Sequence, residues 1–357
     1  MIPVTKTYFP SLDRYQQYLQ KIWESGWLTN RGESVKDLET KIQSYLNCVP
    51  FIAMNNGTTP IQIALKIFGK GGEVITTPFS YVATTSAIVW ENCTPVFVDI
   101  DRHTLTIDAQ LIEAAITEKT TCILATHVFG NACDVEKIED IAHRHQLKVI
   151  YDAAHCFGTK YNGKSIFDWG DVATCSFHAT KIFHTGEGGA FFSNQPTVLE
   201  QAFHLHNFGH LTPESFEKAG INGKLSELNA AMGHCVLEDI ELIIGERKKI
   251  VTHYKNTLSF QGFQTQTIRN GTETNAAYFP IWFENNEQMM RTLSQLNEAE
   301  IFPRRYFYPS LNTLPYVPHT SCSVSERISQ NILCLPLYVG LELSTVEQIC
   351  NIINQNA

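Results

Sequence analysis

"KVIYDAAHCFGTKYNGKSIFDWGDVATCSFHATKIFHTGEGGAFFS", residues 148–193, is the stretch that decides the fold. Three short apolar runs within it predict strands over residues 148–154, 172–179 and 188–193. Strands that are apolar along almost their whole length are typical of a sheet covered on both faces. We therefore expect this stretch to form the middle of a buried sheet.

The same rhythm extends toward the N-terminus, where short strands alternate with helices. This alternation predicts an α/β fold with a mostly parallel central sheet covered by helices. In such sheets, ligands bind beyond the carboxyl ends of the strands. The further strands are expected over 51–54, 73–79, 95–100 and 122–129, and the helices over 60–68, 81–92 and 134–146.

The two ends of the chain differ from this pattern. Residues 11–25 and 35–46 have helical periodicity and are separated by the breaker "GWLTNRGES". From residue 245 onward, long polar helices, one strand at 276–283 and a loop rich in Pro and Tyr at 304–318 follow one another. We therefore predict a large α/β domain over 1–245, with a helical N-terminal segment, and a smaller α+β domain over 246–357.

Composition excludes several classes of protein. The 27 Lys and Arg against 36 Asp and Glu give a net charge of −9 without a basic tail, which argues against nucleic-acid binding. No apolar run is long enough to cross a membrane, and the N-terminus lacks the pattern of a secretory signal. None of the ten cysteines forms a C-x-x-C pair, so we expect reduced thiols, a cytoplasmic protein and no metal site.

Three strand ends carry complementary chemical groups. Lys181 lies between a strand and the Gly-rich turn 186–189, where a desolvated amine can lose its proton and attack a carbonyl carbon. Asp152 ends an apolar strand and needs a cationic or donor partner, because burying a lone carboxylate is costly. The turn Gly57–Thr59 opens a helix, where backbone amides and hydroxyls can hold an anion.

Each group has an ordinary alternative: a solvated lysine, an N-cap aspartate and a capped turn. Their combination points to pyridoxal 5′-phosphate (PLP), which needs an amine for its aldehyde, a carboxylate for its pyridine nitrogen and donors for its phosphate. Lys181, Asp152 and the turn at Gly57–Thr59 together with Ser176 supply one each. The sequence therefore predicts a PLP-dependent enzyme.

Six ordered blocks make the chain similar to the DegT/StrS family, the PLP-dependent nucleotide-sugar aminotransferases of fold type I. The resemblance begins near residue 27, continues into the C-terminal domain and implies the fold type I architecture. The blocks are "NNGTTPIQIAL", "PFSYVATTSAI", "PVFVDID", "THVFGNACDVEKIEDIAHRHQLKVIYDAAHCFGTKYNGK", "SFHATKIFHTGEGGA" and "GINGKLSELNAAMG".

The resemblance implies roles for the matching residues. Lys181 would bind the aldehyde of the cofactor, Asp152 would pair with the pyridine nitrogen, and His155, where the family mostly has Gln, would contact the phenolic oxygen. Tyr81 would stack on the ring. Asn222 would reach the cofactor phosphate of the neighbouring subunit, which implies a homodimer with shared active sites.

The resemblance places the cofactor phosphate on Ser176 and on the turn formed by Gly57, Thr58 and Thr59. Asn56 stands where the family usually has Ser. We expect this difference to weaken one side-chain contact and to leave the backbone amides free.

By the same resemblance, L-glutamate is the amino donor and a nucleotide-linked keto-deoxy sugar is the acceptor. The favoured acceptor is TDP-4-keto-6-deoxy-D-glucose, which yields a 4-amino-4,6-dideoxyhexose for O-antigen or another surface polysaccharide. Candidate substrate ligands are Thr29 in "WLTNRG" and Arg304, Arg305 and Tyr308 in "RRYFYPSL".

Three alternatives stay open. The chain could aminate the 3-keto isomer, because amination at C3 and at C4 uses the same machinery. It could be a sugar dehydratase, although family members with that activity replace the lysine by His, and Lys181 is present. It could also be a non-enzymatic PLP-binding sensor on the same fold.

Overall fold

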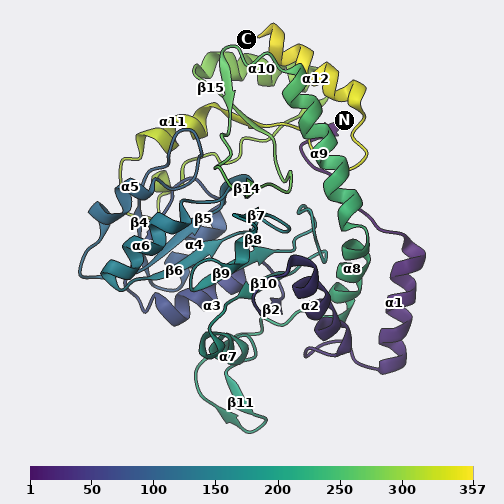
Figure 1. Cartoon of the computed structure of the whole chain (residues 1–357), viewed down its shortest axis with the longest axis vertical. Coiled ribbons are helices and arrows are strands. Elements are labelled where there is room, and N and C mark those ends of the chain that lie inside the picture. Colours follow the sequence, from purple (N-terminus) through teal and green to yellow (C-terminus); the bar gives the residue numbers. More distant parts are fainter. Residues whose placement is uncertain (357) are drawn as a thin grey trace.

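The computed structural model describes residues 1–356, and a seven-stranded sheet forms the centre of this part of the chain (Figure 1). The strand order is β2-β10-β9-β6-β5-β3-β4. β10 is antiparallel to both of its neighbours, whereas the other adjacent pairs are parallel, which confirms the expected sheet. The strands are β2 (Phe51–Met54), β3 (Glu73–Thr76), β4 (Thr94–Phe97), β5 (Thr120–Thr126), β6 (Lys148–Asp152), β9 (Val172–Ser176) and β10 (Gly189–Phe192).

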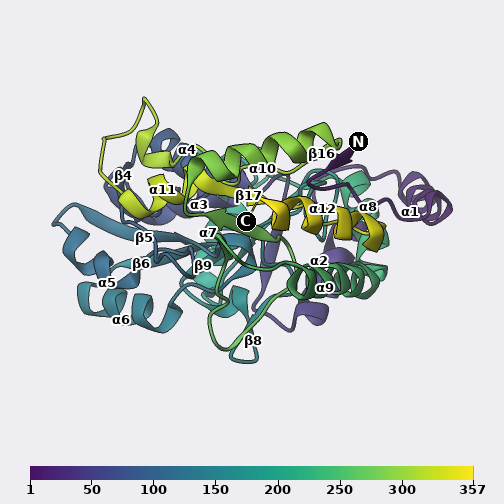
Figure 2. The same ribbon diagram turned by 90° about the horizontal axis from the view of Figure 1, so that it is seen from above.

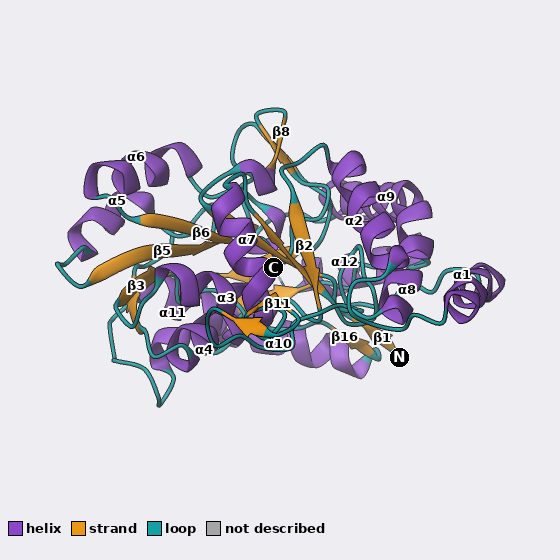
Figure 3. Ribbon diagram, turned by 90° about the horizontal axis from the view of Figure 1, so that it is seen from below, coloured by secondary structure: helices purple, strands orange, loops and turns teal. Residues whose placement is uncertain are grey.

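Helices cover both faces of this sheet. Successive side chains of each strand point to opposite faces, so strands that are apolar throughout place apolar side chains on both. Ile123 and Val149 face a core shared with α2, α6 and α8, while Leu124 and Ile150 face a core shared with α3, α4 and α7. Figure 3 shows α6 on one side of the sheet and α3 and α4 on the other. The covering helices are α2 (Glu33–Leu46), α3 (Thr58–Phe68), α4 (Val82–Trp90), α6 (Val135–His145), α7 (Pro196–Leu205) and α8 (Glu227–Glu238).

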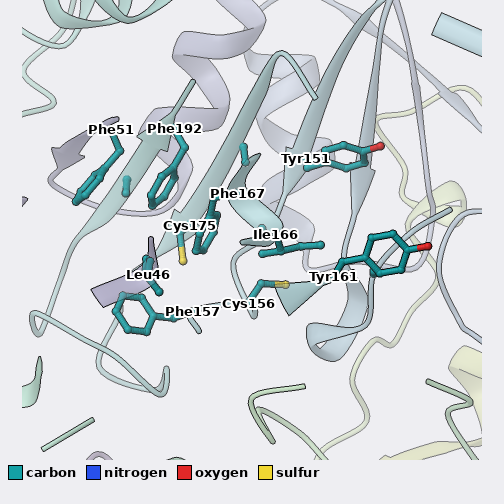
Figure 4. Close-up of a cluster of buried hydrophobic side chains, with 14 of the residues drawn as sticks. Leu46, Phe51, Tyr151, Cys156, Phe157, Tyr161, Ile166, Phe167, Cys175 and Phe192 are labelled. Atoms are coloured by element: carbon teal, nitrogen blue, oxygen red, sulfur yellow. The ribbon is translucent and has the colours of Figure 1, made fainter. Parts of the chain in front are cut away.

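Stacked aromatic rings fill the core beside β2 and β10 (Figure 4). The ring of Phe192 in β10 stacks on Phe167, with centroids 4.1 Å apart, and on Phe51 of β2 at 4.7 Å. Phe157 stacks on Phe183 at 4.3 Å. Such pairs contribute beyond the area they bury. Phe192 pairs with Ala173 near the start of β9, so its stack lies at the opposite end of β9 from the lysine-bearing segment, whereas Phe183 lies two residues after Lys181.

The register of the strands brings the candidate groups to one edge. Thr126 of β5 pairs with Asp152 of β6, and Asp152 pairs with Thr174 of β9. Gly189 of β10 pairs with both Ser176 of β9 and Met54 of β2. The segments that follow β2, β6 and β9 therefore begin at the same carboxyl edge of the sheet.

A second, smaller sheet of order β13-β15-β17 lies in the C-terminal part, which Figure 2 shows from above. Its antiparallel strands are covered by α9, α10 and α12 through a core that includes Tyr254, Phe283 and Ile349. These elements are α9 (Ile240–Thr257), β13 (Phe263–Thr265), β15 (Pro280–Phe283), α10 (Asn286–Glu298), α11 (Ser323–Asn331), β17 (Ile332–Cys334) and α12 (Leu343–Gln355).

Two features bear on the proposed domain boundary after residue 245. α9 runs through this position as one continuous helix. The N-terminal strand β1 (Ile2–Pro3) pairs with β16 (Ile301–Phe302), so the first residues of the chain pack on the C-terminal part. The boundary stays a proposal, and a division made by packing would assign the first four residues to the small domain.

The remaining elements lie outside the two main sheets. α1 (Leu12–Ser25) stands at the side of the molecule and packs on α8 (Figure 1). The other short elements are β7 (Lys160–Tyr161), β8 (Lys164–Ser165), β14 (Thr272–Glu273), β11 (His210–Thr212), β12 (Ser215–Phe216), α5 (Ala109–Ile112) and the 3-10 turns Glu113–Ala115, Val128–Gly130, Ile166–Asp168 and Leu311–Thr313.

Seven of the eight predicted strands are shorter in the structure than in the sequence pattern, and two of them meet irregular backbone at one end. The strand expected over 122–129 ends at Thr126, because the chain turns there and Phe129 adopts a positive φ of 59°. The strand expected over 276–283 begins at Pro280, and Ala276 has a φ of 58°. Both irregular segments lie next to the site described below.

Across residues 1–356, no helix combines the length and the apolar character that crossing a membrane requires. All ten cysteines are free thiols. These residues also contain no cluster of three or more His, Cys, Asp or Glu side chains that could hold a metal ion.

Candidate active site

Lys181 lies just beyond β9, with its side chain partly buried in a cavity at the carboxyl edge of the sheet. Its Nζ donates a hydrogen bond of 3.3 Å to the hydroxyl of Tyr278, which comes from the segment before β15. The cavity is lined by Ala154, His155, Phe157, Ser176, Thr180, Lys181, Ile182, Asn275, Ala277 and Tyr278.

Asp152 ends β6 and is buried, with 5% of its surface exposed. Its Oδ2 accepts a 2.7 Å hydrogen bond from Thr84 Oγ1, and its Oδ1 accepts one of 3.1 Å from the backbone N–H of Ala154. Both donors are neutral. The pKa of Asp152 is raised above its usual value, because burial raises it by more than these two bonds and the charge of Lys181 lower it. The site therefore contains a buried carboxylate that a cationic donor would stabilise.

Thr84, which the sequence patterns did not single out, connects Asp152 to a buried chain of hydroxyls. Thr84 Oγ1 lies 2.8 Å from Ser80 Oγ, which accepts a 3.1 Å bond from Thr126 Oγ1. This chain holds the carboxylate in one orientation. Because hydroxyls donate or accept as required, the chain can adjust when a ligand binds.

His155 is buried, and its Nδ1 accepts a 3.1 Å hydrogen bond from the backbone N–H of Phe129. Burial, with a contribution from Lys181, holds the pKa of His155 well below its usual value, so the ring is neutral. A neutral ring that accepts at Nδ1 carries its proton on Nε2. Its plane is parallel to the ring of Phe307 within 5°, which keeps this donor in place.

The pKa of Lys181 is raised above its ordinary value. Burial lowers it, but Tyr278, the carboxylate of Asp152 and Tyr306 together raise it by more. The expectation of an amine that burial alone deprotonates is therefore wrong for the ligand-free protein. A ligand that brings its own positive charge to Asp152 would offset the contribution of that carboxylate to the raised pKa of Lys181.

The turn after β2 lies against the end of β9. A Cβ added to Gly57 would lie 2.7 Å from the Cβ of Ser176, so only glycine allows this approach. The side chain of Asn56 caps the helix that follows: its Oδ1 accepts from the backbone N–H groups of Thr58 and Thr59 at 2.8 and 2.9 Å. The prediction that Asn56 leaves these amides free is wrong, because the carboxamide is itself a favourable N-cap.

The hydroxyl of Thr59 also points within the turn, donating to Asn55 Oδ1 at 2.8 Å. An anion at this turn therefore meets Ser176 and the Gly57 backbone directly, whereas reaching the amides of Thr58 and Thr59 requires the Asn56 side chain to move.

Three other candidates are exposed at the surface of the single chain. Tyr81 precedes α4 with 59% of its surface exposed. Thr29 and Asn222 are also exposed, and the backbone carbonyl of Asn222 accepts a 3.1 Å bond from Asn55 Nδ2. The last contact joins the segment of Asn222 to the turn after β2.

The side chains of the loop at 304–308 make two separate sets of contacts: Arg305 and Tyr308 contact each other, and Tyr306 contacts Tyr278. Arg305 stacks on Tyr308, with its guanidinium carbon 3.7 Å from the ring centroid, and donates to the carbonyl of Gln330. Tyr306 instead packs edge-on against Tyr278, with centroids 5.8 Å apart. Of the two predicted arginines, Arg304 lies over the ring of Tyr306 at 5.4 Å.

Sequence reasoning missed Tyr278, Tyr306 and Phe307 as site residues. Tyr306 and Phe307 lie inside the block "RRYFYPSL", from which the resemblance indicates only the arginines and Tyr308. Tyr278 lies in an apolar run that reads as a core strand. Both segments are rich in aromatic residues, which is a signal for a binding site, but composition alone does not show which rings face the cavity.

The residues around the cavity fit PLP. Lys181 supplies a primary amine, Asp152 a buried carboxylate bonded to two neutral donors, His155 a fixed neutral donor, and Ser176 with the Gly57 turn a phosphate cradle. These are the groups that the aldehyde, the pyridine nitrogen, the phenolic oxygen and the phosphate of this cofactor require.

Comparisons with known proteins point to one family of aminotransferases. The profile of the DegT/DnrJ/EryC1/StrS aminotransferase family matches residues 12–354. A dTDP-4-amino-4,6-dideoxy-D-glucose transaminase of Shigella dysenteriae is 38% identical over 99% of this chain and 98% of its own length. A GDP-perosamine synthase of Vibrio cholerae is 32% identical over the same shares of the two chains. The crystal structure of DesI in the presence of its TDP-sugar product superposes with a TM-score of 0.93 at 27% identity, covering 99% of this chain and 92% of that one.

The Asn56 cap generates a prediction. Replacing Asn56 by Ala removes the cap and should destabilise the ligand-free protein by about 0.5–2 kcal/mol, but it frees two amides for an anion. We expect a larger rise in Tm than in the wild type when 4′-deoxypyridoxine 5′-phosphate, which has the phosphate and no aldehyde, is added.

The control is Asn285→Ala, which removes the cap of α10, where Asn285 Oδ1 accepts from the N–H of Glu287 at 2.8 Å, far from the turn. It should lower the Tm without changing the rise on adding the compound. A smaller rise for Asn56→Ala than for the wild type would show that the carboxamide itself holds the phosphate.

Proposed function

The chain belongs to the DegT/DnrJ/EryC1/StrS aminotransferase family, and from this premise we propose that it transfers the amino group of L-glutamate to a nucleotide-linked keto-deoxy sugar with PLP as cofactor. The observation that carries the proposal is the buried Asp152 carboxylate, which has only neutral donors and lies at the same sheet edge as Lys181. A site of that kind suits a cationic heterocycle next to a primary amine.

We propose dTDP-4-keto-6-deoxy-D-glucose as the acceptor and a dTDP-4-amino-4,6-dideoxyhexose as the product, destined for a surface polysaccharide such as O-antigen. Two relatives that are each 38% identical over 99% of the chain, from Shigella dysenteriae and Escherichia coli, are transaminases of dTDP-4-amino-4,6-dideoxy-D-glucose. A dTDP-3-amino-3,6-dideoxy-alpha-D-galactopyranose transaminase of Aneurinibacillus thermoaerophilus is 30% identical, which supports the 3-keto isomer less strongly.

When bound, the cofactor supplies an aldehyde that takes up the amino group and a ring that accepts electrons from the neighbouring carbon. Asp152 would hold the proton on the ring nitrogen. Lys181 would remove the proton from the α-carbon of glutamate and, in the second half of the cycle, deliver a proton to the sugar carbon that receives nitrogen. His155 would hold the phenolic oxygen, and Ser176 and the Gly57 turn would anchor the phosphate.

The proposed active sites are shared within a homodimer. α1 and the residues around it expose large apolar side chains that a partner would cover: Phe9 is 78% exposed, Leu12 66% and Trp23 68%. Exposed apolar surface of this kind marks an interface. Asn222 would reach the cofactor phosphate of the other subunit, with Thr29, Arg304, Arg305 and Tyr308 near the nucleotide sugar. We place this enzyme in the cytoplasm, where unpaired thiols such as its ten cysteines persist.

The proposed reaction is tested by incubating the protein with L-glutamate, PLP and one of three acceptors: dTDP-4-keto-6-deoxyglucose, its 3-keto isomer or the GDP-linked 4-keto-6-deoxy sugar. We expect NMR of the product to show nitrogen at C4 of the dTDP sugar. Lys181→Ala should be folded, colourless after dialysis and inactive, because the amine that binds the cofactor is gone.

A control with Lys160→Ala, an exposed lysine of β7, should keep both colour and turnover. Turnover of the 3-keto isomer alone would move the assignment to C3. Binding of PLP without turnover of any acceptor would favour the non-enzymatic sensor.

A second prediction concerns Asp152→Asn, which keeps the size of the side chain but removes its charge. A neutral amide loses a charge-assisted hydrogen bond of about 1.5–3 kcal/mol. We expect PLP to bind still and the rate of the glutamate half-reaction to fall by about a hundredfold or more, measured in a stopped-flow spectrophotometer. Asp108→Asn, at the N-cap of α5, is the matched control and should leave the rate unchanged. An unchanged rate for Asp152→Asn would mean that another group protonates the ring.

The shared site generates a third prediction. Lys181→Ala and Asn222→Ala proteins should each be impaired, and mixing them should restore activity toward a quarter of the wild-type value, because half of the dimers are hybrids with one intact site of two. Subunit exchange is verified by native mass spectrometry with an isotope-labelled partner. A mixture that exchanges subunits and stays inactive would place Asn222 in the site of its own chain.

A further inference from the structure

We propose that Tyr278 is a further catalytic residue of this site, and that Arg247 and Asn275 position its hydroxyl against the amine of Lys181. The inference rests on the proposed function, because it assigns a partner to the lysine that binds the cofactor there. It arises from a contact between the two parts of the chain, which no sequence motif indicates.

The ring of Tyr278 is held on several sides while its hydroxyl reaches the cavity. Its centroid lies 4.7 Å from the ring of His155, 5.4 Å from Phe129 and 5.8 Å from Tyr306. The hydroxyl accepts the 3.3 Å hydrogen bond from Lys181 Nζ. The amine is thus directed by a phenol whose own position is fixed by packing.

Arg247 of α9 is buried, with 6% of its surface exposed. Its Nε donates to the carbonyl of Ala276 at 3.0 Å and its Nη2 to that of Ala277 at 2.6 Å. Among residues 1–356, no carboxylate is bonded to it. Burying a cation without a counterion is costly. The two carbonyls that it holds belong to the two residues directly before Tyr278, so the fixed geometry of the guanidinium sets the backbone that carries the tyrosine.

Asn275 holds the same backbone through its own hydrogen bonds. Its Nδ2 donates to the carbonyls of His155 and Phe157 at 2.8 and 2.9 Å, and its Oδ1 accepts from the N–H of Ala277 at 3.0 Å. Between these clamps Ala276 adopts a φ of 58°, a left-handed conformation that is unfavourable for alanine. Strained backbone persists where the surrounding contacts enforce it, and it gathers at functional sites.

The chemistry of a phenol suits this position. A tyrosine hydroxyl can accept a hydrogen bond from a protonated amine and donate one to a neutral amine. Tyr278 can therefore remain bonded to Lys181 in both protonation states that a general acid and base must adopt. By accepting from the ammonium form, it also favours the charged state of the lysine, in opposition to burial.

The test measures the lysine amine without the cofactor. PLP-free protein is labelled briefly with acetic anhydride at a series of pH values, and acetylation of the Lys181 peptide is quantified by mass spectrometry. Only the neutral amine reacts. Because Tyr278→Phe loses the acceptor but keeps the ring, its midpoint should move down by about one pH unit relative to the wild type.

The matched control is Tyr306→Phe, which removes a hydroxyl from the ring that packs against Tyr278 at 5.8 Å. Its midpoint should move by less than half of that amount. Equal midpoints for Tyr278→Phe and the wild type would overturn the proposal, as would equal shifts for the two tyrosine variants.

The positioning role is tested with Arg247→Lys, which keeps the charge but cannot span two carbonyls. Alone, it should lower the midpoint in the same direction as Tyr278→Phe, and in the Tyr278→Phe background it should add nothing, because Arg247 acts through the tyrosine. Additive shifts would overturn this part of the proposal. If Arg247→Lys does not fold, as judged by circular dichroism, Asn275→Ser takes its place in the same cycle.

Failure of the proposed function would look different. Borohydride treatment of the PLP-loaded protein should attach the cofactor to the Lys181 peptide. If it does not, the proposed function is wrong, whatever the midpoints show. If it does and Tyr278→Phe leaves the midpoint unchanged, only the role of Tyr278 is wrong.

Discussion

The site depends on one buried negative charge, the carboxylate of Asp152 at the end of β6. It is nearly inaccessible and is bonded to two neutral donors, Thr84 and the backbone of Ala154. A carboxylate in such surroundings is stabilised only by a nearby cation or a further donor. In the ligand-free chain the charge of Lys181 partly meets this need and Asp152 in turn raises the pKa of the lysine. The state of the amine and the requirement for a cationic cofactor ring are therefore two consequences of the same buried charge.

The parallel sheet brings the other groups to that charge. β2, β6 and β9 end at one edge, and the antiparallel strand β10 lies between β2 and β9. Gly57 and Ser176 therefore approach each other so closely that only glycine fits at position 57. The cradle formed in this way is already partly occupied in the ligand-free chain, because Asn56 bonds to two of its amides. An internal cap stabilises the helix and competes with an incoming phosphate. The affinity for the cofactor therefore depends on how much more strongly the two amides bind the phosphate than they bind the Asn56 side chain.

The C-terminal part of the chain supplies residues that line the cavity. Tyr278 contacts the lysine, Phe307 stacks on His155, and Arg247 of the helix that links the two parts holds the backbone before Tyr278. A movement of this C-terminal part relative to the sheet would thus change the surroundings of the amine directly. The exposed Tyr81, Thr29 and Asn222 lie on surface that the single chain leaves uncovered, which agrees with a site finished by a second subunit.

Apolar periodicity and strand-end position are local properties of the chain, so the sequence predicts the sheet and its helices and places Lys181, Asp152 and Gly57 at strand ends. The sequence also indicates the family, because several motifs in a fixed order are more specific than any one of them alone. Only the tertiary structure decided how these groups behave. The capping of Thr58 and Thr59 by Asn56 depends on a side-chain rotamer, and the raised pKa of Lys181 depends on a tyrosine almost a hundred residues away that reads as part of a core strand. Contacts between distant segments set charge and orientation at the site, and no local pattern in the chain records them.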